Sequence, residues 1–316
     1  MSGSAKWSEV ALKFGSDEPD IVPSQRNTDD FFSIPPTHQR ADAILAHLRY
    51  PEARASFVSG MMDIYDNAPG VNRMLVEAGR LGIFSFVMGL WADYNPQDRT
   101  TWPTVNRLKG QIDRCGLASS RHIDDVLAWL AATDYIVLQR IADDRRVRLL
   151  KPTERMITQD YRMILPFFRA LDLLFGGARY ALFLERYRAC QRVRQKVTTA
   201  IFPWATSLLP QNRDLTIFFD RTCAIQILFK LVALDATRSE HAARETSLVE
   251  FGTRLGMSRT HVRNILRDAE EAGLMVRSRR DGVFHHLTPD CVTAFDRFVA
   301  NALSLVDRAC LLTTPS

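Results

Sequence analysis

The stretch "GMSRTHVRNILRDAEEAGL", residues 256–274, contains the pattern that indicates the fold of this chain most clearly. Its apolar residues follow the i, i+3, i+4, i+7 spacing of one helix face, at Val262, Ile265, Leu266 and Ala269. Ser258 stands before this face, where an N-cap is expected. The outer face is polar and basic, with Arg259, Thr260, Arg263, Asn264 and Arg267. The stretch therefore predicts an amphipathic helix that buries one side and presents arginines on the other.

A second copy of this pattern precedes it, in "GLASSRHIDDVLAWLAATDY", residues 116–135. The two copies align at an offset of 139 residues (258 − 119), which pairs Ser119 with Ser258. The apolar spacing is the same in both copies. The outer faces differ in charge, because Asp124 stands where the later copy has Arg263. The chain therefore contains one helical shape twice, with opposite charge on its outer face.

A predicted β-hairpin follows each copy. The first pairs "YIVLQRI" (135–141) with "RVRLL" (146–150), and the second pairs "LMVRSRR" (274–280) with "VFHHL" (283–287) around the turn signal Asp-Gly. A helix, a turn, a second helix that opens with Ser and a basic hairpin form a winged helix-turn-helix. The second helix of such a unit fits the major groove of DNA. Its hairpin, the wing, carries arginines to the backbone or the minor groove.

The remaining sequence predicts a mostly α chain of 316 residues with two domains. Residues 1–39 are polar and proline-rich, which is typical of an extended or disordered arm. Residues 40–165 and 166–316 are interpreted as two repeats of one unit, since "YPEARASFV" also resembles "GGARYALFL" upstream of the helix pairs. The expected fold is a pair of tandem winged helix-turn-helix domains with small β-hairpin wings, joined by packed helices and arranged about a pseudo-two-fold axis.

Composition narrows the class of protein only mildly. There are 41 Lys and Arg against 36 Asp and Glu, and this small excess permits a nucleic-acid partner without requiring one. Five scattered cysteines include no C-x-x-C pair, which fits a reducing cytoplasm. The longest apolar run, residues 81–91, is shorter than the roughly 20 residues of a membrane span. We therefore expect a cytoplasmic protein without a membrane segment.

No motif of an enzyme is present. The sequence lacks a glycine-rich phosphate loop, G-x-S-x-G and H-E-x-x-H. The adjacent Glu270 and Glu271 diverge around a helix, and the adjacent His285 and His286 point to opposite faces of a strand. We expect no catalytic residues, no cofactor and no metal site.

The segment "ADDRRVRLLKPTERM", residues 142–156, resembles the wing of MarR-family regulators, which reads Asp-x-Arg followed by a strand and Leu-Thr. Asp144-x-Arg146 matches the first part, and "HLTPD" (286–290) supplies the Leu-Thr step in the second copy. "LGMSRTHVRNILRDAEEAGLMVR" (255–277) is similar to the helix-turn-helix of the same family. Members of that family are usually dimers of one-domain chains, so two copies in one chain is a departure from it.

The resemblance implies which residues contact DNA. The reading helix is expected to use Ser258, Arg259, Thr260, Arg263, Asn264 and Arg267. The wings are expected to use Asp144, Arg145, Arg146, Arg148, Arg277, Arg279 and Arg280. The first helix is expected to contribute less, through Ser119, Ser120 and Arg121.

The sequence is compatible with three classes of function. The first is a sequence-specific transcriptional regulator that binds double-stranded DNA, as a monomer acting as a pseudo-dimer or as a homodimer. The second is a plasmid-type replication initiator with tandem winged helices. The third is a protein-interaction scaffold that uses winged helices without DNA. The sequence does not identify a small-molecule effector.

Overall fold

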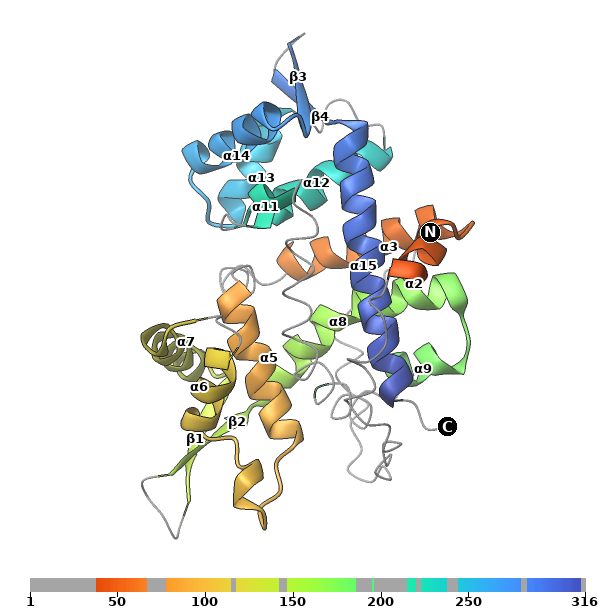
Figure 1. The fold of residues 1–316 in the computed structure, drawn as a ribbon. Coiled ribbons are helices and arrows are strands. Elements are labelled where there is room, and N and C mark those ends of the chain that lie inside the picture. Colours follow the sequence, from red (N-terminus) through yellow and green to blue (C-terminus); the bar gives the residue numbers. More distant parts are fainter. Residues whose placement is uncertain are drawn as a thin grey trace, which may run out of the picture.

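The computed structural model describes residues 38–66, 78–114, 118–141, 147–185, 195, 215–219, 223–237, 244–279 and 283–313. The fold is mostly helical and includes two separate two-stranded antiparallel sheets (Figure 1). These hairpins confirm the predicted strand pairs. Residues 1–37 of the predicted arm lie outside the described residues, and helix α2 (His38–Leu45) already begins inside the segment assigned to the arm.

Two segments of the chain have the same order of helices and strands. The first contains α5 (Ala78–Ala92), α6 (Val105–Arg114), α7 (Ser120–Ala132), β1 (Ile136–Arg140), β2 (Arg148–Pro152) and α8 (Glu154–Phe175). The second contains α12 (Ala224–Thr237), α13 (Glu245–Arg254), α14 (Arg259–Glu271), β3 (Met275–Arg279), β4 (Val283–Leu287) and α15 (Pro289–Thr313). A short 3-10 turn, η2 (Arg99–Thr101), precedes α6.

The two helices α7 and α14 begin and end in the same way. The hydroxyl of Ser119 accepts a hydrogen bond from the backbone N–H of His122, and Ser258 accepts one from His261, so both predicted N-caps are confirmed. Each helix is followed by a residue with a left-handed backbone, Asp134 at φ 59° and Gly273 at φ 73°. The capping and the turn are therefore alike although most side chains differ.

The hairpins also join their helices in the same way. The backbone N–H of Tyr135 donates to Leu130 at 2.8 Å, and that of Leu274 donates to Ala269 at 2.9 Å. After the second strand of each hairpin a threonine closes the unit, since the N–H of Thr153 donates to Tyr135 and that of Thr288 donates to Leu274. Thr153 and Thr288 then accept a hydrogen bond from the first turn of the next helix.

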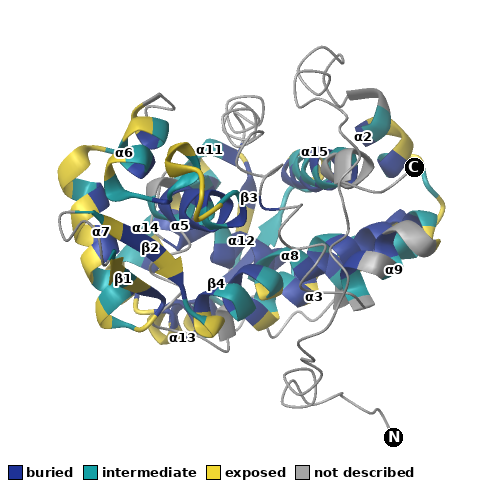
Figure 2. Ribbon diagram, turned by 90° about the horizontal axis from the view of Figure 1, so that it is seen from below, coloured by how far each residue is buried: buried dark blue, intermediate teal, exposed yellow. Residues whose placement is uncertain are grey.

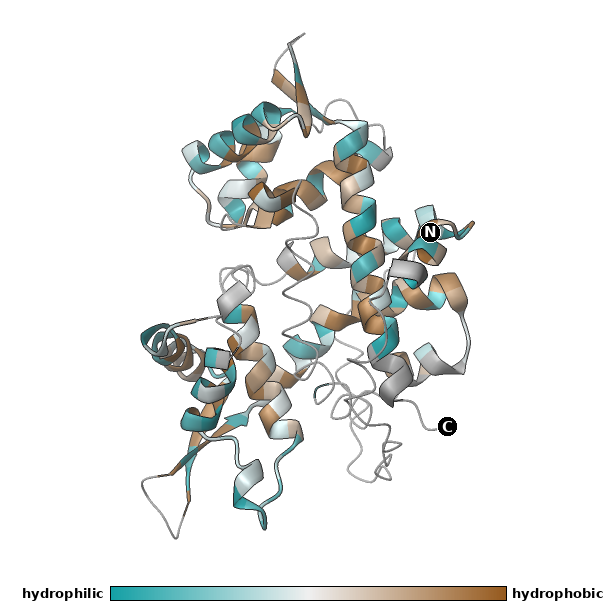
Figure 3. Cartoon of the chain, viewed as in Figure 1, coloured by the Kyte–Doolittle hydropathy of each residue, from teal (hydrophilic) through white to brown (hydrophobic). Residues whose placement is uncertain are grey.

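One apolar helix supports each of these units. Helix α5 packs against α6, α7 and β2, and α12 packs against α13 and β4. Both helices are strongly apolar and are drawn mainly in brown in Figure 3. The spacing of apolar residues in α7 and α14 explains why these helices bury only one face, which consists of Ile123, Val126, Leu127 and Leu130 in the first and Val262, Ile265, Leu266 and Ala269 in the second.

The hydrophobic cores divide the chain differently from the predicted repeats 40–165 and 166–316. Helix α8 runs without interruption through the predicted boundary. Helices α2 and α3 (Tyr50–Asp66) share their core with residues 168–303, whereas residues 83–156 form a core of their own. The reason is tertiary packing, since Gly60 of α3 lies directly against Pro166 of α8 and no Cβ would fit there.

Polar contacts attach the N-terminal helices to α15. The hydroxyl of Tyr50 donates to the side chain and the backbone of Asp296, both at 3.1 Å. Arg54 and Arg40 form ion pairs with Asp296 and Asp307 at 2.6 and 3.3 Å. Helices from both ends of the chain therefore form one helical body, which also includes α9 (Ala178–Glu185) and α11 (Thr216–Phe219).

Figure 1 shows how the two units lie relative to this helical body. Helices α7 and α14 are both on the left, the hairpins β3–β4 and β1–β2 lie at the top and the bottom, and α2, α9 and α15 lie to the right. Figure 2, turned about the horizontal axis, keeps α7 and α14 to the left of α15. None of the helices in the described part of the chain is both long and apolar enough to cross a membrane.

Candidate nucleic-acid interface

The N-terminal half of α14 presents polar and basic side chains to solvent. Ser258, Arg259 and Thr260 are exposed at the start of the helix. One turn later the side chain of Arg263 is 58% exposed and that of Asn264 is half-buried, and Arg267 is again exposed. Because the buried face lies opposite, these residues share the solvent side of one helix, as the sequence predicts. This side could meet the edges of bases in a major groove.

Two arginines of this unit, one on α14 and one on β3, hold carboxylates of the same unit. Arg267 lies 3.3 Å from Asp268, and Arg277 of β3 lies 3.3 Å from Glu270. Both pairs are near the surface, where an ion pair contributes little to stability. A DNA phosphate can therefore replace the carboxylate partner of either arginine at a small cost in free energy.

The pair formed by Arg263 differs from these surface pairs. Its Nε donates to Oε1 of Glu245 at 2.9 Å, and Glu245 stands in the first turn of α13 with a side chain that is only 22% exposed. The other carboxylate oxygen, Oε2, lies 3.5 Å from Nε2 of His285 on β4. Glu245 therefore connects the outer face of α14 with the interior of the hairpin.

His285 is almost completely buried, with 2% of its side chain exposed. Burial lowers the pKa of its imidazole below the ordinary value of 6.5, although Glu245 acts in the opposite direction. The ring is therefore mainly neutral near pH 7 and can donate from Nε2 to the carboxylate. The sequence pattern gives no role to Glu245, and it suggests His285 only as a metal ligand, which the opposite directions of adjacent strand residues argue against. An acidic residue at the start of α13 was the only available signal, and it is equally typical of an ordinary helix N-terminus.

The wing residues are only partly described. Arg148 at the start of β2 and Arg277 on β3 are exposed. The backbone of Arg279 belongs to β3, paired with Val283. The expected wing residues Asp144, Arg145, Arg146 and Arg280 lie outside the described residues.

Helix α7 presents a different outer face. Ser119, Ser120 and Arg121 are exposed at its start. Further along, Asp124 and Asp125 are also exposed, and Lys109 of α6 lies 2.7 Å from the carboxylate of Asp124. The exposed residues of α6 and α7 gather on the left side of Figure 2. The solvent face of α7 is therefore a mixed surface in which acids occupy the middle.

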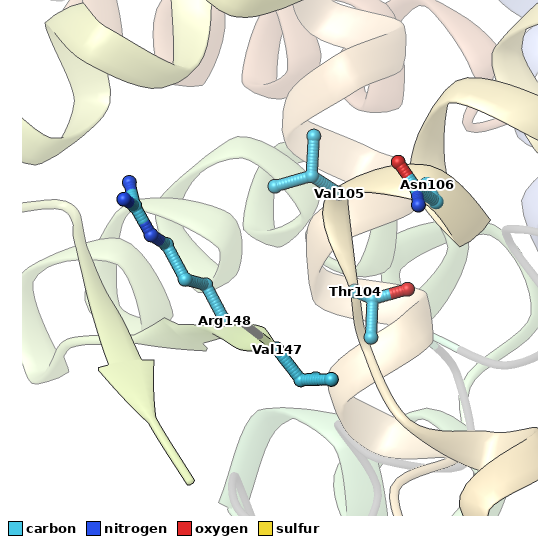
Figure 4. A pocket seen from close by; sticks show the side chains of 5 residues that line it. All are labelled: Thr104, Val105, Asn106, Val147 and Arg148. Carbon is cyan, nitrogen blue, oxygen red and sulfur yellow. The ribbon is translucent and has the colours of Figure 1, made fainter. Parts of the chain in front are cut away.

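A pocket of about 370 Å³ opens between the start of α6 and the start of β2, and it is lined by Thr104, Val105, Asn106, Val147 and Arg148. In Figure 4 the guanidinium of Arg148 extends from the strand on one side and the residues at the start of α6 occupy the other. In the second unit Glu245 begins α13 where Val105 begins α6. Within the described residues no group of three or more His, Cys, Asp or Glu side chains could hold a metal ion.

Comparison of the chain with models of protein families, with curated proteins and with solved structures found no match.

Proposed function

We propose that this protein is a sequence-specific regulator that binds double-stranded DNA through two winged helix-turn-helix units in one chain. In this proposal α14 is a reading helix in the major groove, and the hairpins β1–β2 and β3–β4 are wings on the flanking backbone or minor groove. We also propose that the chain is related to MarR-family regulators, which its helix-turn-helix and wing sequences resemble. A duplex-DNA partner implies a cytoplasmic location.

One observation carries the proposal. Helix α14 buries its apolar face against its own unit and presents Arg259, Thr260 and Arg263 together at its N-terminal end. The N-terminal residues of a recognition helix are those that reach base edges. The positive end of the helix dipole also favours a nearby phosphate.

The repetition of the unit supports a pseudo-dimer. Helices α7 and α14 lie on the same side of the molecule, with the two hairpins at opposite ends (Figure 1). A single chain with this arrangement could address two half-sites about one helical turn, roughly 34 Å, apart. The departure from two-fold symmetry lies in charge, since Asp124 and Asp125 occupy the outer face of α7.

The test begins with duplex binding measured by fluorescence anisotropy at several salt concentrations, using the full chain and a random-sequence duplex. Affinity that falls steeply with salt supports a DNA-binding protein. Absence of duplex binding at low salt leaves the interaction scaffold as the function. Selection from a random duplex library then identifies the site. A palindrome with two half-sites indicates a regulator, whereas a set of directly repeated elements indicates a replication initiator.

A further inference from the structure

The two units of this chain differ in three positions that change together. The equivalence comes from matching hydrogen bonds, because the N–H of Leu108 donates to Thr104 in α6 as that of Leu248 donates to Arg244 in α13. The bridges between Thr104 and Leu149 and between Arg244 and Phe284 then align the second strands of the hairpins.

By this alignment Glu245, Arg263 and His285 in the second unit stand where the first unit has Val105, Asp124 and Leu150. The unit with an arginine on its outer face therefore also has the carboxylate and the buried imidazole. The unit with an aspartate there has two apolar residues instead, and Leu150 is fully buried. A carboxylate beside the arginine and a histidine behind the carboxylate thus occur as one set.

We infer that Glu245 is a positioning residue that holds Arg263 in the orientation for reading a guanine, with His285 fixing the carboxylate from behind. The inference rests on the proposed DNA-binding function and deepens it. Glu245 accepts from Nε of Arg263 at 2.9 Å, and the terminal nitrogens of Arg263 make no hydrogen bond to any described residue. These two nitrogens remain for the O6 and N7 acceptors of guanine in the major groove.

The physical reason is the geometry of the guanidinium group. It is planar, with donors in a fixed fork, so a hydrogen bond at Nε sets the plane and the direction of the other two donors. A flexible arginine loses rotamer freedom when it binds a base, and part of that loss is already incurred in the free protein if Glu245 holds the side chain. Since the carboxylate repels phosphates, Glu245 should raise selectivity and lower binding to DNA in general.

The test compares Glu245→Ala, Arg263→Ala and their double variant on the selected duplex and on duplexes changed at one base pair. Glu271→Gln is the matched control, because it removes one negative charge from the 70% exposed partner of Arg267. We expect Glu245→Ala to reduce the preference for the selected base pair about five- to tenfold, at the same base pair that Arg263→Ala affects. The double variant should show the same preference as Arg263→Ala alone, because Glu245 acts through Arg263. Glu271→Gln should keep the preference.

A second variant keeps the test decisive if Glu245→Ala does not fold. The double exchange Glu245→Val with His285→Leu installs the residues that the first unit has in these places and leaves no unpaired buried histidine. It should retain duplex binding and lose the same base preference. If either folded variant keeps the full preference while Arg263→Ala loses it, the positioning role is wrong and the proposed function stands. If the wild-type protein shows no salt-dependent duplex binding, both the role and the proposed function are wrong.

Discussion

Lys109 and Asp124 form an ion pair of 2.7 Å between α6 and α7, and Glu245 and Arg263 form one of 2.9 Å between α13 and α14, although Glu245 stands where the first unit has Val105, one helical turn before Lys109. The sign of the charge on the outer helix is thus reversed, since Asp124 stands on α7 where Arg263 stands on α14. Side chains that face a groove between phosphates are repelled if they are acidic. The two units therefore present different electrostatic surfaces on the same type of helix.

The first prediction follows from this reversal. Replacing Asp124 and Asp125 by alanine should leave duplex affinity unchanged or raise it, because the change removes repulsion and frees Lys109 from its partner. Arg263→Ala should instead cost about 1–3 kcal/mol and relax specificity at one base pair. Titration of both variants against the selected duplex at fixed salt measures the two effects. A large loss from the aspartate pair with little from Arg263 would assign the reading role to α7.

The second prediction concerns the wings. Arg148 and Arg277 lie on hairpin strands and are exposed, so each should act on phosphate or the minor groove and not on base edges. Alanine at either position should weaken binding to all duplexes alike and reduce the salt slope by about one. The measurement is affinity against salt concentration for a specific and a random duplex. A changed base preference with an unchanged salt slope would contradict this role for the wings.

Much of the local structure could be predicted from the sequence, because it depends on neighbours along the chain. The apolar spacing and the serine caps predicted α7 and α14, and two strand-like runs around an Asp-Gly turn signal predicted the second hairpin. The pairs made by Glu245 could not be predicted, since they join residues 18 and 40 positions apart through the packing of three elements. The position of α3 in the core of the second half depends on tertiary packing in the same way.

The third prediction tests the turn that ends α7 and α14. Asp134 has φ 59° and its counterpart Gly273 has φ 73°, a left-handed conformation that only glycine adopts without cost. Asp134→Gly relieves the strain of the left-handed backbone, and the greater freedom of glycine in the unfolded chain offsets part or all of this gain. The free energy of unfolding should therefore stay unchanged or rise by up to about 1 kcal/mol. Gly273→Ala should lower it by about 1–2 kcal/mol. Urea unfolding of both variants measures this, and equal effects of the same sign would contradict the argument.

The last prediction concerns the pH dependence of stability at His285. Burial lowers the pKa of this imidazole below 6.5 in the folded protein, while Glu245 and Glu270 raise it and Arg277 lowers it further. Below about pH 6.5 the unfolded chain therefore binds a proton more readily than the folded chain, so the free energy of unfolding falls as the pH falls through this range. His285→Leu removes this component and introduces the residue that the first unit has there, Leu150. Urea unfolding at about pH 7 and about pH 5 should show a smaller loss of stability on acidification for the variant than for the wild type. An equal loss in both proteins would mean that His285 keeps its ordinary pKa in the fold.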